Sequence, residues 1–104
     1  MTQTPLIIPI DHPAFAGHFP GTPIVPGVVL LDEALHAICA AEGMSLAACH
    51  INSVKFLSPL EPGESVIIEH EVQESGVIKF EVLCGERRIV AGSVTPGWEV
   101  RISA

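Results

Sequence analysis

The sequence predicts an α+β domain in which one helix precedes an antiparallel sheet. Two patterns carry this prediction. In residues 27–43 the apolar side chains recur at spacings of three and four, the period of an amphipathic helix. After residue 48 they alternate with polar side chains instead, the period of a strand with one buried face. Pro-Gly, Ser-Gly and Gly-Glu turn signals divide this second part into segments of strand length.

The predicted helix begins at Gly27 and ends at Gly43, because glycine readily adopts the left-handed conformation at a helix end. Asp32 and His36 interrupt its apolar pattern four residues apart, so they lie on one line along the helix surface. The apolar stripe consists of Val28, Leu31, Leu35, Ile38 and Cys39.

Five further segments have the composition of strands. They are residues 6–10, 51–57, 66–74, 77–84 and 88–95, and residues 96–104 are expected to add a short last strand. Residues 11–26 contain four prolines and two glycines, which predicts an ordered, non-helical loop. The helix covers one face of such a sheet, and an unpaired strand edge remains for a second copy.

The composition limits the size and partners of the protein. The 104 residues predict a single domain, residues 1–104. Hydrophobic residues make up 48% of the chain, so we expect part of the apolar surface to be buried against another subunit. No apolar run approaches the ~18 residues that span a bilayer, and no signal peptide is recognisable. We therefore predict no membrane association.

Charge and cysteine content give two more expectations. The formal net charge of −7 repels a phosphate backbone, so nucleic acid is not an expected partner. The three cysteines show no metal-ligand spacing and are odd in number. Reduced thiols in the cytoplasm are the simplest interpretation.

The segment that carries chemistry is residues 17–28. It places His18 just ahead of a helix N-terminus, where unpaired N–H groups and the helix dipole stabilise negative charge on an oxygen. Gly27 allows a ligand to approach these amides closely. Asp32 follows within the same helix, so an imidazole and a carboxyl group form an acid–base pair for proton abstraction beside a carbonyl. Taken singly, a loop histidine and an aspartate in the first turns of a helix are more often structural.

These residues resemble a known family. The segment Gly-His-Phe-Pro-Gly-Thr-Pro-Ile-Val-Pro-Gly-Val, residues 17–28, is similar to the active-site loop of the 3-hydroxyacyl-[acyl-carrier-protein] dehydratases of the hot-dog superfamily. The resemblance continues through residues 30–32 and resumes at Val-Lys-Phe-Leu-Ser-Pro-Leu-Glu-Pro-Gly-Glu, residues 54–64. The resemblance as a whole covers residues 11–92. The short chain and the Asp-His-Pro-Ala-Phe-Ala-Gly-His-Phe-Pro opening look most like the small ApeI-like dehydratases of aryl-polyene clusters.

The resemblance implies a fold and a set of roles. The fold is a hot-dog, an antiparallel sheet wrapped around one central helix, and two copies form a homodimer with two active sites or a further assembly of dimers. His18 would abstract the proton alpha to the thioester carbonyl, and Asp32 of the other subunit would protonate the departing 3-hydroxyl. The amides of Gly27 and Val28 would hold the thioester oxygen. The substrate-lining residues would be Phe19, Val25 and His36.

The implied reaction converts a 3-hydroxyacyl thioester on an acyl carrier protein into the trans-2-enoyl thioester, in fatty-acid-like or polyene biosynthesis. It needs no metal and no cofactor, since a thioester already acidifies its alpha proton. Two positions depart from the family. Many members have Glu at the position of Asp32, and Glu33 beside it points about 100° away in a helix. Relatives often have Gln where this chain has His36, which would either orient Asp32 or line the acyl tunnel.

Other functions remain open at this point. A hot-dog thioester hydrolase or a non-catalytic acyl-binding or partner subunit would share the fold. Glu33 and His36 have metal-ligand spacing, but no partner carboxylates accompany them. An acyl carrier protein is acidic, so its docking on this acidic chain would need a local basic patch. The alternative interpretation is that the basic residues are scattered charges that only keep the chain soluble. That patch would draw on Lys55, Arg87, Arg88 and Arg101. His12 would shape the loop, and His50 and His70 are expected on strand surfaces.

Overall fold

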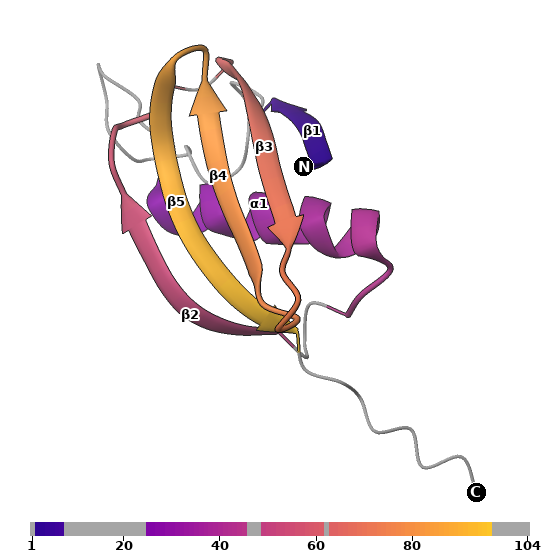
Figure 1. Cartoon of the computed structure of the whole chain (residues 1–104). Coiled ribbons are helices and arrows are strands. Elements are labelled where there is room, and N and C mark those ends of the chain that lie inside the picture. Colours follow the sequence, from indigo (N-terminus) through magenta and orange to yellow (C-terminus); the bar gives the residue numbers. More distant parts are fainter. Residues whose placement is uncertain (1, 8–24, 46–48, 62, 97–104) are drawn as a thin grey trace, which may run out of the picture.

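The computed structural model describes residues 2–7, 25–45, 49–61 and 63–96. In this part of the chain, one helix packs across one face of a five-stranded antiparallel sheet, as Figure 1 shows. The elements are β1 (Thr2–Ile7), α1 (Gly27–Glu42), β2 (Cys49–Phe56), β3 (Ser65–Val72), β4 (Ile78–Cys84) and β5 (Arg87–Pro96). This arrangement confirms the predicted α+β class.

The strand order is β1-β3-β4-β5-β2, and all four neighbouring pairs are antiparallel. β3, β4 and β5 form an antiparallel meander through the predicted Ser-Gly and Gly-Glu turns, whereas β2 pairs with β5 and not with β3, which follows it in the chain. β1 and β2, which flank α1 in the sequence, lie at opposite edges of the sheet. The side of β2 that faces away from β5 therefore has no strand beside it among the described residues.

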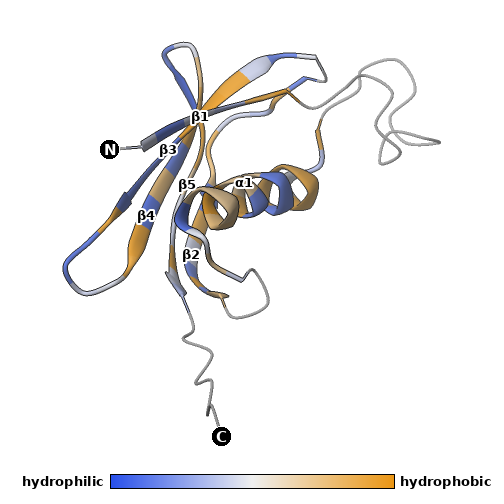
Figure 2. Cartoon of the chain, turned by 90° about the vertical axis from the view of Figure 1, so that its right-hand side faces the viewer, coloured by the Kyte–Doolittle hydropathy of each residue, from blue (hydrophilic) through white to orange (hydrophobic). Residues whose placement is uncertain are grey.

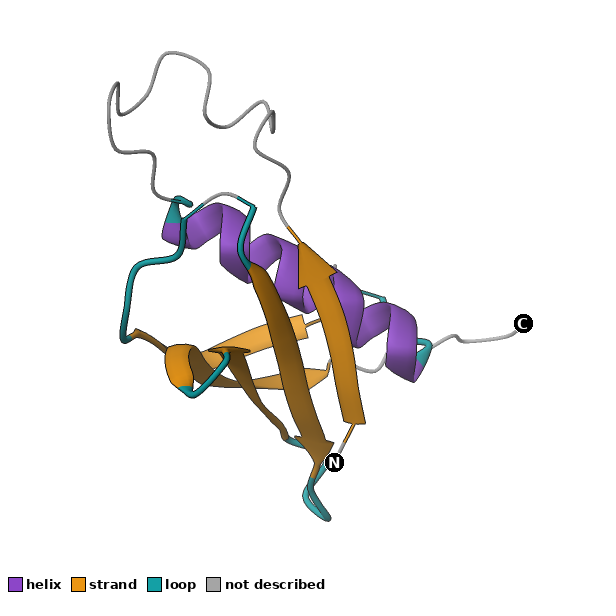
Figure 3. Cartoon of the chain, turned by 90° about the horizontal axis from the view of Figure 1, so that it is seen from above, coloured by secondary structure: helices purple, strands orange, loops and turns teal. Residues whose placement is uncertain are grey.

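α1 has the predicted bounds because its sequence supplies apolar residues at helical spacing and a stop. Its buried face consists of Leu30, Ala34, Leu35, Ile38 and Cys39, so the predicted place of Val28 in the buried stripe is wrong, as Val28 is 72% exposed. Gly43 ends the helix with φ of 68°, and the Gly43 N–H donates to the Cys39 carbonyl oxygen. Figures 2 and 3 show the helix lying along one face of the curved sheet. No helix in the described part of the chain is long and apolar enough to cross a membrane.

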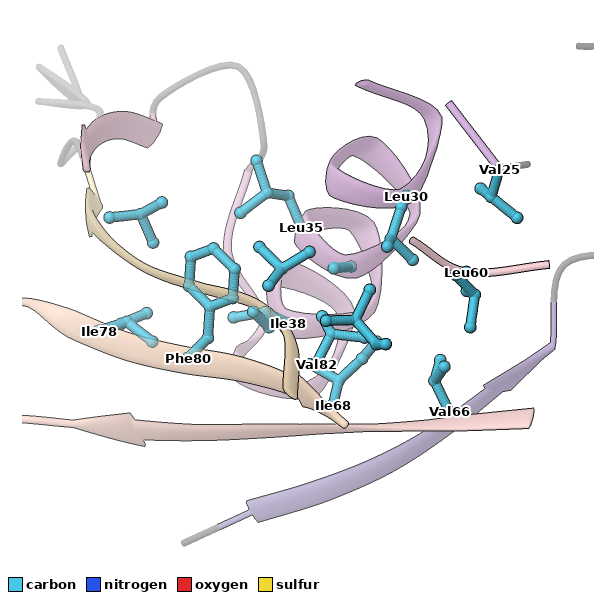
Figure 4. Packing of buried hydrophobic residues seen from close by; sticks show 14 residues of the cluster. Val25, Leu30, Leu35, Ile38, Leu60, Val66, Ile68, Ile78, Phe80 and Val82 are labelled. Carbon is cyan, nitrogen blue, oxygen red and sulfur yellow. The ribbon is translucent and has the colours of Figure 1, made fainter. Parts of the chain in front are cut away.

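The core lies between α1 and this face of the sheet, as the close-up in Figure 4 shows. Residues of one parity in each strand face the helix, because successive side chains of a strand point to opposite faces. The helix contributes Leu30, Ala34, Leu35 and Ile38, and the three meander strands contribute Val66, Ile68, Ile78, Phe80, Val82, Ile89, Val90 and Val94, where Ile89 and Val90 are both buried beside an irregularity in the β4–β5 register.

His70 belongs to this buried set, so its predicted place on a strand surface is wrong. It follows Val66 and Ile68 with the same parity, and only 1% of it is exposed. Its Nε2 lies 3.1 Å from a carboxylate oxygen of Glu42, the last residue of α1. A polar side chain is tolerated there because the helix end supplies this partner. His50, by contrast, is exposed as predicted.

Several predicted boundaries differ from the structure: β2 begins at Cys49 rather than at residue 51, and β3 ends at Val72 rather than at residue 74. The first strand begins at Thr2 rather than at residue 6, because its polar N-terminal half still pairs with β3, with Thr2 opposite His70. Apolar content was therefore too narrow a criterion for an edge strand. β5 extends to Pro96. The predicted loop at 11–26 and the predicted tail strand at 96–104 lie almost wholly outside the described residues.

Candidate active site

The structure describes some of the predicted site residues and not others. Val25, Gly27, Val28, Asp32 and His36 are described. His18 and Phe19 fall within residues 8–24, outside the described part. The predicted pairing of His18 with Asp32 therefore stays a prediction. The described site residues lie at or near the start of α1.

The start of α1 has backbone N–H groups without a hydrogen-bond acceptor among the described residues. The N–H groups of Val29 and Leu30 both donate to the carbonyl oxygen of Pro26, at 3.0 and 3.1 Å. The N–H groups of Gly27 and Val28 meet no hydrogen-bond acceptor among the described residues. They lie at the positive end of the helix dipole, so they are suited to a carbonyl oxygen on which negative charge develops.

An apolar cavity of about 400 Å³ adjoins this helix start. Its wall comes from three parts of the chain: the entry to α1, the end of β2 with the connection that follows, and β5. The lining residues are Val25, Gly27, Leu30, Phe56, Leu57, Ser58, Pro59, Leu60 and Ile89. Ser58 alone in this set has a polar side chain, so the cavity suits the hydrocarbon part of a ligand better than its polar part.

Two contacts hold the helix start against β2. The Val25 N–H donates to the Leu60 carbonyl oxygen at 2.7 Å, which ties the chain entering α1 to the connection after β2. The Phe56 ring packs directly on Gly27, where a Cβ atom would lie 2.8 Å from a ring carbon. Glycine is therefore needed here for close approach of the Phe56 ring. Gly27 also lines the cavity, so its backbone is accessible from that side.

Asp32 lies on the outer surface of α1 in the single chain, with 60% of its side chain exposed. His36 Nδ1 donates to the Asp32 carbonyl oxygen at 2.8 Å and lies 3.5 Å from Asp32 Oδ1. Neither residue lines the apolar cavity. With Val28, which is 72% exposed, they form a strip along α1, defined as Val28, Asp32 and His36.

Phe56 is a site residue that the sequence patterns did not single out. It lies in the segment that resembles the family's strand and turn, yet no motif marked its side chain. The available signal was the pair Phe56-Leu57, since two adjacent large apolar residues cannot both face the core of one strand. Both are about half exposed, at 55% and 49%.

The turn after β2 is held in place by a carboxylate. Glu64 accepts a hydrogen bond from the Glu61 N–H at 2.8 Å, and Arg87 on β5 donates to both of its carboxylate oxygens at 3.2 Å. The Glu61 N–H, then the Cys84 thiol and the Arg87 guanidinium, hold the pKa of Glu64 below its usual value. Burial and the Glu64 carboxylate raise the pKa of the Cys84 thiol. This cluster fixes the segment that forms one wall of the cavity.

The basic residues do not gather at the cavity. Arg87 bonds to Glu64, and Arg88 donates to Glu81 at 2.8 Å, so both arginines are paired within the chain. Lys55, Lys79 and Arg88 instead line a second hollow on the sheet face away from α1, together with Glu69, Glu71 and Glu81. Arg101 lies outside the described residues. No cluster of three or more potential metal-ligating side chains occurs in the described ranges.

Comparison with known proteins identifies the family of the chain. The model of the ApeI-like family, described as ApeI dehydratase, matches residues 2–93. A 3-hydroxyacyl-[acyl-carrier-protein] dehydratase FabZ from Wolbachia is 29% identical over 99 residues, covering 85% of this chain and 69% of the relative. That from Rhizorhabdus wittichii is 37% identical over 87 residues, covering 71% and 54%. The chain thus spans about half to two thirds of the length of such relatives.

Solved structures agree with the family match. The structure described as the dehydratase heterocomplex ApeI:P from Xenorhabdus doucetiae aligns with a TM-score of 0.73 and 26% identity, over 92% of this chain and 86% of that one. The fluoroacetyl-CoA-specific thioesterase FlK aligns with a TM-score of 0.61 over 92% of this chain and 89% of that one, but at 14% identity it shares the fold alone. The chain therefore has the hot-dog fold, and it belongs to the ApeI-like dehydratase family.

Proposed function

We propose that this chain, as a homodimer, removes water from a 3-hydroxyacyl thioester carried by an acyl carrier protein and so produces the trans-2-enoyl thioester. The observation that carries the proposal is the start of α1, where the N–H groups of Gly27 and Val28 have no acceptor among the described residues and Gly27 lines an apolar cavity. An acyl chain fits the cavity while its thioester oxygen meets the amides. Family membership supplies the reaction type.

The proposed mechanism uses three groups. The neutral imidazole of His18 takes the alpha proton, and the negative charge that develops on the thioester oxygen is stabilised by the amides of Gly27 and Val28. The carboxyl group of Asp32 then protonates the 3-hydroxyl, which leaves as water. His36 holds the Asp32 backbone through its 2.8 Å hydrogen bond, so we assign it a positioning role.

The surface of the single chain favours a second subunit. β2 is an edge strand with exposed apolar side chains, namely Ile51 at 44% and Phe56 at 55%, and Leu57, directly after it, is 49% exposed. The strip along α1 is exposed as well, although an acid that protonates a leaving group works best away from bulk water. A second copy that paired along β2 would join the two sheets and cover Asp32, which supports an active site shared between subunits.

The mass of the purified chain in solution tests this assembly. We expect a dimer by light scattering, and Ile51→Lys, which adds a charge to the unpaired edge, should shift it to monomer. Val72→Lys is the matched control, because Val72 is 50% exposed but lies on β3, away from this edge. A wild-type monomer would contradict the homodimer and would favour a non-catalytic or partner-subunit role, as a heterocomplex is known for the ApeI relative.

Water elimination tests the activity directly. Purified protein is given 3-hydroxyacyl thioesters of several chain lengths, on carrier protein and on coenzyme A, and enoyl-thioester absorbance is followed. We expect turnover that falls at least ~100-fold in His18→Ala and in Asp32→Asn. Glu33→Gln removes the neighbouring carboxylate and should stay within a few-fold of wild type. Inactivity on all substrates, or hydrolysis of the thioester, would overturn the proposed dehydratase activity.

We also propose a cytoplasmic location, which the free thiols of all three cysteines support.

A further inference from the structure

Two thiols meet at the end of α1 that is remote from the candidate active site. Cys39, in the last turns of the helix, places its Sγ atom 3.6 Å from Sγ of Cys49, the first residue of β2. Cys39 follows Gly27 by twelve residues, about 18 Å along the helix axis. The two cysteines are thus well separated from the amides and the cavity, and the proposed dehydration does not use them.

We propose that Cys39 and Cys49 form a redox site, at which a small-molecule disulfide such as oxidised glutathione converts the two thiols into an intramolecular disulfide. The side chains already face each other, and forming a bond of about 2.05 Å requires the sulfur atoms to approach by ~1.5 Å. Cys84 provides the contrast within the chain. Its Sγ donates to Glu64 at 3.3 Å and has no sulfur partner among the described residues.

The exchange proceeds in two steps that balance. The thiolate of Cys49 attacks one sulfur of the small disulfide, which releases one small thiolate and leaves a mixed disulfide on Cys49. The thiolate of Cys39 then attacks the Cys49 sulfur, forms the intramolecular bond and releases the second small thiolate. The two protons lost by the cysteines go to the released thiolates. The protein loses two electrons, and the small disulfide gains them.

The surroundings set the order of these steps. Cys49 is partly exposed, while Cys39 is 4% exposed. Burial, together with the neighbouring Cys49, raises the pKa of the Cys39 thiol to about 11. Cys49 therefore meets the reagent first, and Cys39 acts as the internal thiol that resolves the mixed disulfide.

The bond would link the end of α1 to the beginning of the edge strand β2. It would close a loop between positions only ten apart in the sequence, which restricts the unfolded chain. We expect the oxidised form to melt at least ~5 °C above the reduced form. The difference should vanish when a reductant is added.

The experiment equilibrates the full-length chain in glutathione buffers of rising oxidised fraction, followed by acid quenching, alkylation and mass spectrometry. Proteolysis after Glu42, which lies between the two cysteines, separates them unless a disulfide joins them. We expect a linked Cys39–Cys49 peptide pair and a product lighter by two hydrogen atoms. Mixing isotopically light and heavy chains shows that the link is intramolecular. Cys84→Ser, the matched control, should give the same product.

The Cys39→Ser variant tests the order of steps, because it lacks the resolving thiol and should accumulate glutathione on Cys49. The wild-type peptide map decides the proposal even if this variant folds poorly. Three thiols that stay free in the most oxidising buffer would overturn it, and so would stable glutathione adducts or links only between chains. None of these readouts depends on dehydratase activity.

Discussion

At the scale of single residues, Gly27 combines two roles. Its N–H belongs to the proposed oxyanion site, and its missing side chain makes room for the Phe56 ring. Gly27→Ala would place a methyl group 2.8 Å from a ring carbon, so the ring or the helix start must move. We expect a loss of about 1–3 kcal/mol in the free energy of unfolding, the usual cost of overpacking, measured by urea denaturation.

A second variant distinguishes this clash from a general effect of substitution at the helix start. In a Phe56→Leu background the ring is gone, and Gly27→Ala should cost much less. The double-mutant cycle isolates the contact between the two residues. Val28→Ala, at the exposed neighbouring position, is the control and should change stability by less than ~0.5 kcal/mol. Equal losses in both backgrounds would contradict the steric explanation.

His70 is a core residue that the sequence analysis placed wrongly. Its parity with Val66 and Ile68 was visible in the sequence and placed it on the core face. We expected His70 on the surface because it is a histidine, and a polar side chain is rarely buried without a partner. The partner, Glu42, lies 28 positions away at the end of α1, and no local pattern connects the two. Strand periodicity was the stronger evidence.

At the scale of elements, Glu64 joins the turn between β2 and β3 to β5. Its pKa is lowered in the folded chain, chiefly by the Glu61 N–H, so the carboxylate form stabilises the fold. This contribution is complete above the unfolded-state pKa of about 4.3 and is lost as pH falls through the lower folded-state value. The stability difference between wild type and Glu64→Gln should therefore be largest near neutral pH and shrink below about pH 4.

Denaturation series from neutral to acidic pH measure this difference. Arg87→Ala is the informative companion, because it removes the guanidinium but leaves the hydrogen bond from the Glu61 N–H. Most of the pH dependence should survive in that variant. If Arg87→Ala abolishes it, the guanidinium rather than the turn N–H is the main cause of the lowered pKa.

Elements were predictable to different degrees for physical reasons. α1 was predicted with both ends, because apolar residues at helical spacing and a glycine stop are local signals. β3, β4 and β5 were predicted because the turns between them carry their own glycines, but the pairing of β2 with β5 rather than β3 has no local signal. β1 was misplaced, since its N-terminal residues are ordered by pairing with β3 rather than by their own apolar content. The cavity was not predictable from local pattern, because its wall joins residues that are distant in the sequence.

At the scale of the whole molecule, the exposure of Asp32 is the feature that a single chain leaves unexplained. The cavity and the amides of α1 belong to one chain, while Asp32 points away from the cavity, at the surface. A site that takes His18 from one subunit and Asp32 from the other accounts for this placement. Such a shared site makes a specific prediction about mixtures of inactive variants.

His18→Ala and Asp32→Asn are expected to be inactive on their own. In a dimer that contains one chain of each kind, one site loses both groups and the other keeps both. Unfolding and refolding the two variants together in equal amounts makes half of the dimers mixed, so up to about a quarter of wild-type turnover should return. Each variant refolded alone is the control. If the mixture stays inactive although mass spectrometry detects mixed dimers, both groups act within one subunit, and the exposure of Asp32 needs another explanation.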